Sequence, residues 1–325
     1  MDLDRLSAEL LRSLRGHRSQ VQFSRWLGYR SNVAHTWEAG KRWPTASTVL
    51  SAAARVGIDV TAGLRRFYKV QPAFLDACDP TSPEGISLML QDLKRDLPIV
   101  EIARRCGASR FQVGRWIRGE SQPRLPDLLR LVEATSQRLL DFVAVLVDPA
   151  TLPSARGPWA RLEAARSLFW RMPHAQLVIL ALELEAYRSL PSHDDAWLAE
   201  RLGLELWEVT GAMDRLEATG QIAREGPRYQ AAEVRTVDTR RHPGAGASLK
   251  RWWAGVAMER IDAPGVSWSY NVVAVSHRDQ QRIVELYRAT FRRMRAIVAG
   301  SAPAEGLMLI QQILLPLDRA EPDLD

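Results

Sequence analysis

The spacing of apolar residues predicts a run of short helices in the first 70 residues. Leucines in residues 2–15 lie three and four positions apart, which places them on one face of a helix. Ser19 and Gln22 have the spacing of a capping box, which predicts a second helix that ends at Gly28. Three more helices are expected over about 31–38, starting at Pro44-Thr45-Ala46-Ser47, and over 61–68. Together the five predict a compact helical domain at 1–70.

The five-helix pattern recurs after a segment rich in proline and small residues. Residues 71–85 contain Pro72, Pro80 and Pro83, and are expected to form a linker. A second helical domain is expected at 86–148. Its helices are expected over about 86–95, 100–106, 110–117, 126–134 and 136–146. Residues 149–172 are expected to form a further linker and a connecting helix.

A motif inside each domain repeats at an offset of 79 residues. Glycine, tryptophan, glycine and proline recur at the same intervals, as Gly28, Trp37, Gly40 and Pro44 and again as Gly107, Trp116, Gly119 and Pro123. The first glycine supplies a residue that tolerates left-handed φ at a turn. Ser109 is a good cap for the helix that follows in the second copy, whereas Arg30 is a poor one in the first.

The remaining chain predicts a third and a fourth unit. At 173–235, three helices over 174–188, 195–202 and 205–218 precede a hairpin with Gly226-Pro227 at its turn, which is typical of a winged helix. At 247–318, a helix, a strand over 266–275, a long helix from Ser276 and a strand over 306–317 predict a parallel βαβ unit. The expected fold is therefore mainly α, ending in a winged-helix-like unit and a small α+β domain.

Charge is distributed unevenly around a net value of +6. Residues 1–70 carry 12 basic and 5 acidic side chains, whereas residues 174–231 carry 5 basic and 10 acidic ones. The first domain therefore suits a polyanion, and the third unit does not. No apolar stretch is long enough to span a membrane, and the first residues do not resemble a signal peptide. Cys78 and Cys106 lack metal-ligand spacing, so we expect reduced thiols, no metal, no cofactor and a cytoplasmic protein.

Trp37-Glu38-Ala39-Gly40, followed by Pro44, resembles the Xre-type, lambda-repressor-like helix-turn-helix family of transcriptional regulators. The resemblance covers roughly residues 3–68 and 86–146, and the second copy departs from it by carrying Ile117 in place of the glutamate. It implies that the helix after the turn enters the major groove of DNA. By position, the implied base contacts are Ser31, Asn32, His35 and Thr36 in the first copy, and Arg110, Phe111, Gln112 and Arg115 in the second. The implied phosphate contacts are Arg25, Lys41, Arg42, Arg104, Arg105 and Arg118.

These residue types suit the implied role. Arginine can bond guanine in bidentate fashion, and asparagine or glutamine can do so with adenine. The alternative is that Arg110 and Arg115 only solubilise their helix, and that the first copy docks without contacting bases. Trp37 and Trp116 could stack on bases, but their place opposite the base-facing positions favours the core.

Residues 168–318 also resemble a domain of unknown function that follows helix-turn-helix segments in families of bacterial paralogous regulators. The resembling stretches are Asp195–Gly203, Asn271–Ser276 and Ile310–Leu317. The resemblance implies a regulator with an undefined effector or protein partner. The C-terminal region could form a homodimer, and Trp252-Trp253 with Trp268 and Tyr270 could line an effector pocket or fill a core.

The sequence therefore predicts a sequence-specific regulator of transcription that binds double-stranded DNA. Two different recognition helices in successive major grooves would require a non-palindromic site. The acidic third unit, with Glu205, Glu208, Asp214 and Glu217 on its last helix, favours protein contact, although Arg224 and Arg228 could touch phosphate. An adaptor that contacts the transcription machinery and binds little DNA is the alternative. An enzyme is not expected, because no phosphate-binding glycine loop or Gly-x-Ser-x-Gly turn is present.

Overall fold

The computed structural model describes residues 1–68, 72–232 and 244–317. The chain divides into two compact units, Met1–Glu163 and Ala164–Asp325. Parts of the predicted third and fourth units, at 233–235 and at 318, lie outside the described residues. The described residues are mainly helical, as expected, and their one sheet is a two-stranded hairpin.

The first repeat forms the five expected helices. They are α1 (Leu3–Arg15), α2 (Gln20–Trp26), α3 (Val33–Glu38), α4 (Ala46–Arg55) and α5 (Val60–Phe67). Asp2 caps α1 through its side chain, and Ser19 with Gln22 forms the predicted capping box at α2. Local capping signals thus set the helix starts that the sequence predicts.

The second repeat reproduces this order almost residue for residue. It consists of α7 (Pro83–Lys94), α8 (Ile99–Cys106), α9 (Arg110–Ile117), α10 (Leu125–Ser136) and α11 (Leu139–Leu146). The first residues of α8, α10 and α11 each lie 79 positions after those of α2, α4 and α5. The offset seen in the motif therefore extends through all five helices, and the repeat unit is the whole domain.

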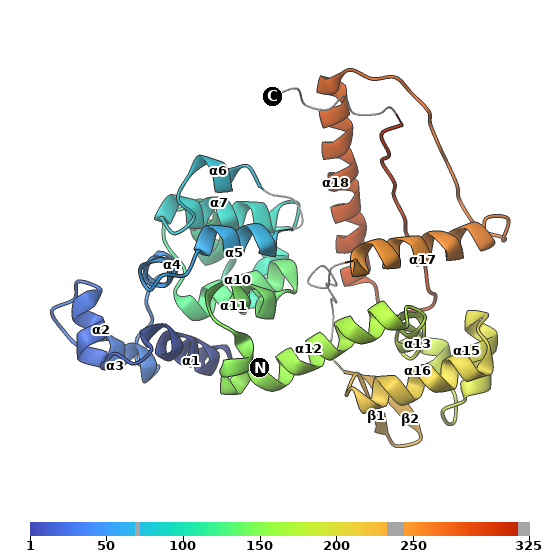
Figure 1. Ribbon diagram of the computed structural model, residues 1–325, viewed down its shortest axis with the longest axis horizontal. Coiled ribbons are helices and arrows are strands. Elements are labelled where there is room, and N and C mark those ends of the chain that lie inside the picture. The colour runs from blue at the N-terminus through green and yellow to red at the C-terminus, as the bar shows by residue number, and fades with distance from the viewer. Residues whose placement is uncertain (69–71, 233–243, 318–325) are drawn as a thin grey trace. The chain divides into compact units, whose positions relative to one another are not determined.

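The two repeats share one hydrophobic core, which differs from the expectation of two separate domains. Helix α5 packs against α11, α4 against α7 and α1 against α10 (Figure 1). The predicted linker 71–85 also contributes to this core, because α6 (Phe74–Ala77) buries Phe74 and Leu75. Burial of these two apolar side chains thus makes the predicted linker part of the core that the two repeats share.

An approximate two-fold relation links the repeats. The backbone N–H of Ala46 donates to the carbonyl of Pro123 at 2.9 Å, and the N–H of Leu125 donates to the carbonyl of Pro44 at 3.0 Å. Each partner lies 79 residues from its counterpart, so the two bonds exchange when the repeats are exchanged. The contacts α1–α10 and α7–α4 exchange in the same way. Repeats that follow one another in sequence are therefore arranged as the two halves of a dimer.

The predicted connecting helix is α12 (Pro153–Arg171), which follows the short 3₁₀ helix η1 (Pro149–Thr151). The buried carboxylate of Glu9 accepts hydrogen bonds from the N–H and the hydroxyl of Ser154, both at 2.8 Å. Glu9 therefore satisfies a donor in the first turn of α12 and holds the start of this helix against α1.

After the end of α12, the second unit contains four helices followed by a hairpin. It contains α13 (Ala175–Ala181), α14 (Glu185–Arg188), α15 (Asp195–Leu202), α16 (Leu206–Ala218), β1 (Ile222–Glu225) and β2 (Arg228–Ala231). The strands are antiparallel, with Ile222 opposite Ala231. The single helix expected over 174–188 is wrong, because Leu184 adopts an extended conformation and separates α13 from α14.

The rest of the second unit departs from the predicted βαβ arrangement. Helices α17 (Ala245–Glu259) and α18 (His277–Gly300) are present. The strands predicted at 266–275 and 306–317 are wrong for the described residues, which form no strand there. Parallel strands are stable when helices cover both faces of their sheet, and two strands with one intervening helix do not provide that cover. The alternating apolar residues are therefore exposed.

Candidate nucleic-acid interface

Helix α3 is shorter than its counterpart because it has a different cap. The side chain of Asn32 accepts a hydrogen bond from the His35 N–H at 3.3 Å and lies 3.3 Å from the Ser24 hydroxyl. The cap is therefore Asn32 and not Arg30, which corrects the assignment made by alignment with Ser109. Because its amide oxygen serves the cap, the amide nitrogen of Asn32 is the atom left to form the predicted base contact.

The two faces of α3 differ as predicted. Ser31, Asn32 and His35 are exposed, and Thr36 is half-buried with its hydroxyl donating to the Val33 carbonyl at 2.8 Å. On the opposite face, Ala34 and Trp37 are buried. The prediction that Trp37 is a core residue is confirmed, and so is the same prediction for Trp116.

A buried carboxylate fixes the end of α3. Glu38 accepts hydrogen bonds from Arg15 at 2.5 and 3.2 Å and from Gln20 at 2.9 Å, so it joins α3 to α1 and α2. Burial raises the pKa of Glu38, but the hydrogen bonds from Arg15 and Gln20 and the charges of Arg15 and Arg12 outweigh it and hold this pKa below its usual value.

The second repeat uses an apolar anchor at the same place. The counterparts of Glu38 and Gln20 are Ile117 and Ile99, and both pack into the hydrophobic core. The glutamate of the family pattern is thus replaced by Ile117, and the glutamine that would bond to it is replaced by Ile99. The two repeats therefore have the same order of helices, although a buried carboxylate anchors α3 and an apolar side chain anchors α9.

Helix α9 presents the predicted second set of side chains. Ser109 caps it by accepting a hydrogen bond from the Gln112 N–H at 3.2 Å, as expected. Arg110, Gln112 and Arg115 are exposed, and Phe111 is 70% exposed. The Arg110 guanidinium lies 4.8 Å from the centre of the Phe111 ring. Arginine and an exposed apolar ring together suit guanine and the thymine methyl group.

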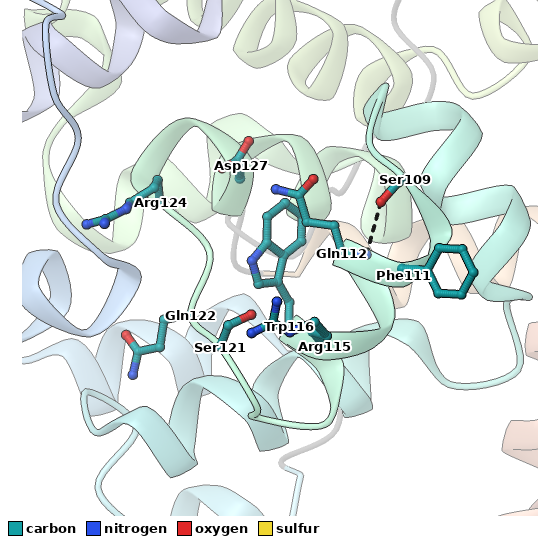
Figure 2. A pocket seen from close by; sticks show the side chains of 9 residues that line it. All are labelled: Ser109, Phe111, Gln112, Arg115, Trp116, Ser121, Gln122, Arg124 and Asp127. Atoms are coloured by element: carbon teal, nitrogen blue, oxygen red, sulfur yellow. Dashed lines mark hydrogen bonds between the residues drawn. The ribbon is translucent and has the colours of Figure 1, made fainter.

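A shallow hollow lies beside α9. Figure 2 shows Gln122 and Arg124 at one side of the lining residues, Phe111 at the opposite side, and Gln112 and Arg115 between them. The first repeat contributes to the same region, because the Ser47 hydroxyl donates to Gln122 at 2.7 Å. The surface formed by the predicted base contacts of the second repeat therefore adjoins the junction between the repeats.

Most cationic side chains beside α9 are neutralised by nearby carboxylates. Glu101 accepts hydrogen bonds from Arg104 at 2.7 Å and from Arg105 at 2.6 Å, and these bonds lower the pKa of Glu101 to about 2. Glu120 binds Arg118 at 2.6 Å and lies 4.0 Å from Arg115. These predicted phosphate contacts would have to exchange a carboxylate for a phosphate.

The first repeat has the opposite electrostatics. Arg25, Lys41 and Arg42 are exposed, and within the described residues no carboxylate forms an ion pair with them. Lys41 occupies the position of Glu120, so this site is reversed in charge between the repeats. The uncompensated positive charge therefore lies next to α3.

The part of the second unit from α14 to β2 contains a polar network that could not be predicted from the sequence. The hydroxyl of Tyr187 lies 3.0 Å from Nδ1 of His193, and Nε2 of His193 lies 2.7 Å from Asp195. The same hydroxyl accepts a hydrogen bond from the Tyr229 N–H at 3.1 Å. Tyr187 is 1% exposed, so the network anchors the hairpin rather than meeting a substrate. Residues separated by six, two and 42 positions give no sequence signal for it.

Apolar side chains are exposed elsewhere in the second unit. On the acidic helix α16, Leu206 and Trp207 are exposed, Trp207 by 72%. Trp252 and Trp253 contact each other edge to face on α17, with ring centres 4.5 Å apart. Trp268 and Tyr270 are exposed, so the prediction that they fill a core is wrong.

The described residues include no helix with the length and hydropathy needed to cross a membrane. They also include no group of three or more histidine, cysteine or acidic side chains placed to hold a metal ion. Cys106 is buried, and desolvation by burial raises the pKa of its thiol to about 11.

Residues 169–315 match the model of a domain of unknown function, DUF4423. This range confirms the predicted resemblance of residues 168–318 to such a domain. No curated protein and no solved structure matches the chain.

Proposed function

We propose that this protein is a transcriptional regulator whose first unit binds duplex DNA in a sequence-specific manner, with α3 and α9 in successive major grooves. The observation that carries the proposal is the repeated frame. Each repeat holds a short helix by a buried tryptophan, Trp37 or Trp116, and exposes polar side chains on the opposite face. A helix held in this way can enter a groove without losing its own packing.

The two recognition helices are suited to different tasks. Arg110, Gln112 and Arg115 on α9 can form bidentate bonds with base edges, which supports sequence specificity. Beside α3, Arg25, Lys41 and Arg42 carry unpaired charge that can bind phosphate. We therefore assign more of the affinity to the first repeat and more of the specificity to the second.

A gel-shift titration on random duplexes tests the proposal. Binding at about 50 mM salt that weakens steeply as salt rises is expected, because each phosphate contact releases counterions. The matched variant Arg25→Ala/Lys41→Ala/Arg42→Ala should bind more weakly and with a smaller salt slope. If the wild-type chain does not bind at low salt, the protein does not act by contacting DNA and the adaptor function is favoured.

The adaptor function has one observation in its favour. Leu206 and Trp207 form an exposed apolar pair on α16, which also carries Glu208, Asp214 and Glu217. An acidic helix with an exposed tryptophan suits a protein partner better than a phosphate backbone. We therefore assign protein contact, not DNA contact, to the winged-helix-like unit.

We further propose that a second copy of the chain pairs with residues 264–276. This stretch contains no charged side chain, and within it Tyr270 and Val272 are 80% and 74% exposed. Monomeric proteins protect exposed extended segments with charges, and these residues lack that protection. Light scattering across a dilution series should show a dimer that Val272→Lys dissociates, whereas Ser267→Lys, at an end of the stretch, should have a smaller effect. A wild-type monomer at every concentration would contradict this proposal.

A further inference from the structure

We infer, on the premise of the proposed DNA binding, that one chain recognises two unlike half-sites in inverted orientation. Repeats in one chain can be related by a translation, which would place their recognition helices on direct repeats. They can also be related by a two-fold axis, which places them on inverted repeats because the strands of DNA are antiparallel. The contacts between the repeats decide between these arrangements.

The hydrogen bonds at the junction have two-fold symmetry. Ala46 bonds to Pro123 and Leu125 bonds to Pro44, and Thr45 and Arg124, which lie between these partners, form an antiparallel bridge. Thr45 and Arg124 are counterparts at the 79-residue offset. A translation would pair each residue with one that is not its counterpart, so reciprocal bonds between counterparts require a two-fold axis through this bridge.

The junction is packed closely enough to fix this orientation. A Cβ atom at Gly63 of α5 would lie only 2.6 Å from a methyl carbon of Val145 in α11. Beside this contact, the rings of Phe67 and Phe142 meet edge to face with centres 5.8 Å apart. Because α5 and α11 meet at a position that admits only glycine, the repeats have little freedom to rotate against each other.

The bridge also lies next to the recognition helices. In each repeat the chain passes from the recognition helix to the bridge in a few residues, from Gly40 to Thr45 and from Gly119 to Arg124. These short connections carry the two-fold relation of the junction to α3 and α9, although α8 packs more closely on α10 than α2 does on α4. The half-sites are unlike because Ser31 and Thr36 have Arg110 and Arg115 as counterparts.

A chain with two identical recognition helices tests the orientation. In Arg110→Ser/Phe111→Asn/Gln112→Val/Gly114→His/Arg115→Thr, five positions of α9 take the residues found 79 positions earlier, which include all four predicted base contacts of the first repeat. Four of these positions are exposed, and a Cβ at Gly114 meets only the end of the flexible Arg118 side chain. Bound sequences are selected from random duplexes of about 40 base pairs, which hold two half-sites one helical turn apart.

The wild-type chain should select a site without internal symmetry, and the variant should select a palindrome. The variant should bind that palindrome about tenfold or more tightly than the same half-sites as a direct repeat. Selection of a direct repeat by the variant would overturn the inverted arrangement while leaving DNA binding intact. Failure of the wild-type chain to bind any duplex would instead overturn the proposed function.

A second measurement covers the case in which the variant does not fold. A DNA-cleaving iron chelate is attached to Val21→Cys or to Val100→Cys, which are exposed counterparts outside the assigned contacts, in a Cys78→Ser background. The two cleavage patterns on the wild-type site should be mirror images about its centre. Patterns that are shifted copies of each other would overturn the two-fold arrangement.

Discussion

Arg15 donates two hydrogen bonds to the buried carboxylate of Glu38. The equivalent residues of the second repeat are Lys94 and Ile117, and isoleucine has no charge to pair with lysine. The same helical frame is therefore held by an ion pair in one repeat and by apolar packing in the other. This difference makes the stability of the first repeat sensitive to changes that leave the second unaffected.

Glu38→Ala should lower the free energy of unfolding by about 2–3 kcal/mol, because Arg15 and Gln20 lose their shared acceptor in a largely buried position. Denaturant unfolding followed by tryptophan fluorescence measures this change. The control Glu84→Ala removes an exposed carboxylate and should change stability by less than about 0.5 kcal/mol. Equal effects of the two substitutions would contradict the anchoring role of Glu38.

Acid should selectively remove the contribution of Glu38 to stability. The pKa of Glu38 is lower in the folded chain than its usual value, so its stabilisation is present above the unfolded pKa and is lost as pH falls through the folded pKa. Unfolding measured from about pH 5 down to pH 2 should therefore show a smaller pH dependence in Glu38→Gln than in the wild type. Parallel curves would show that other carboxylates account for the acid sensitivity.

Arg115→Ala should reduce affinity for the selected site by about 1–3 kcal/mol and relax the preference at one base position. Arg42→Ala should weaken binding to all sequences alike and lower the salt slope by about 1, because it is assigned to phosphate. Binding titrations on the selected site and on single-base variants of it distinguish the two effects. Unchanged preference after both Arg110→Ala and Arg115→Ala would remove the second repeat as a determinant of specificity.

Glu101→Gln should strengthen binding to random DNA. The substitution releases Arg104 and Arg105 from the carboxylate that holds them, and each freed cation that reaches a phosphate should steepen the salt slope by about 0.9. Gel shifts at several salt concentrations measure the slope. Glu84→Gln is the matched control, since it removes one exposed negative charge from the same repeat without releasing these arginines.

Tyr187→Phe should destabilise the hairpin of the second unit. It removes the hydroxyl that bonds to His193 and accepts from Tyr229, at a cost of about 1–3 kcal/mol for the donor left without a partner. Hydrogen exchange should accelerate at β1 and β2 while the first unit is unchanged. Unaltered exchange in the hairpin would show that the network does not anchor it.

Helix positions could be predicted because their signals are local. Ser19 and Ser109 cap where expected, and the buried positions of Trp37 and Trp116 follow from the face each occupies. What those faces pack against could not be predicted, because periodicity shows that a face is buried but does not identify its partner. The apolar face of α5 is thus covered by α11 from the other repeat.

The prediction of two C-terminal strands was wrong for a related reason. Alternation between Val266 and Val275 predicts an extended backbone, but a strand also needs a neighbour to complete its hydrogen bonds, and residues 266–275 form no strand. The cap at Asn32 could not be predicted from the alignment of the two repeats by their glycines, because that alignment places Arg30 at the cap position. The Tyr187 network was missed because its members are close only in the folded chain.

The junction between Pro44 and Pro123 also determines how the first unit responds to dilution. The halves of an ordinary dimer separate when protein is scarce, because association depends on the square of the subunit concentration. Here the peptide chain joins the halves, so their local concentration is fixed by the connection between them and not by the number of molecules in the cell. The fraction of paired recognition helices therefore stays the same at any abundance, and occupancy of a site by a single chain should follow protein level without a threshold.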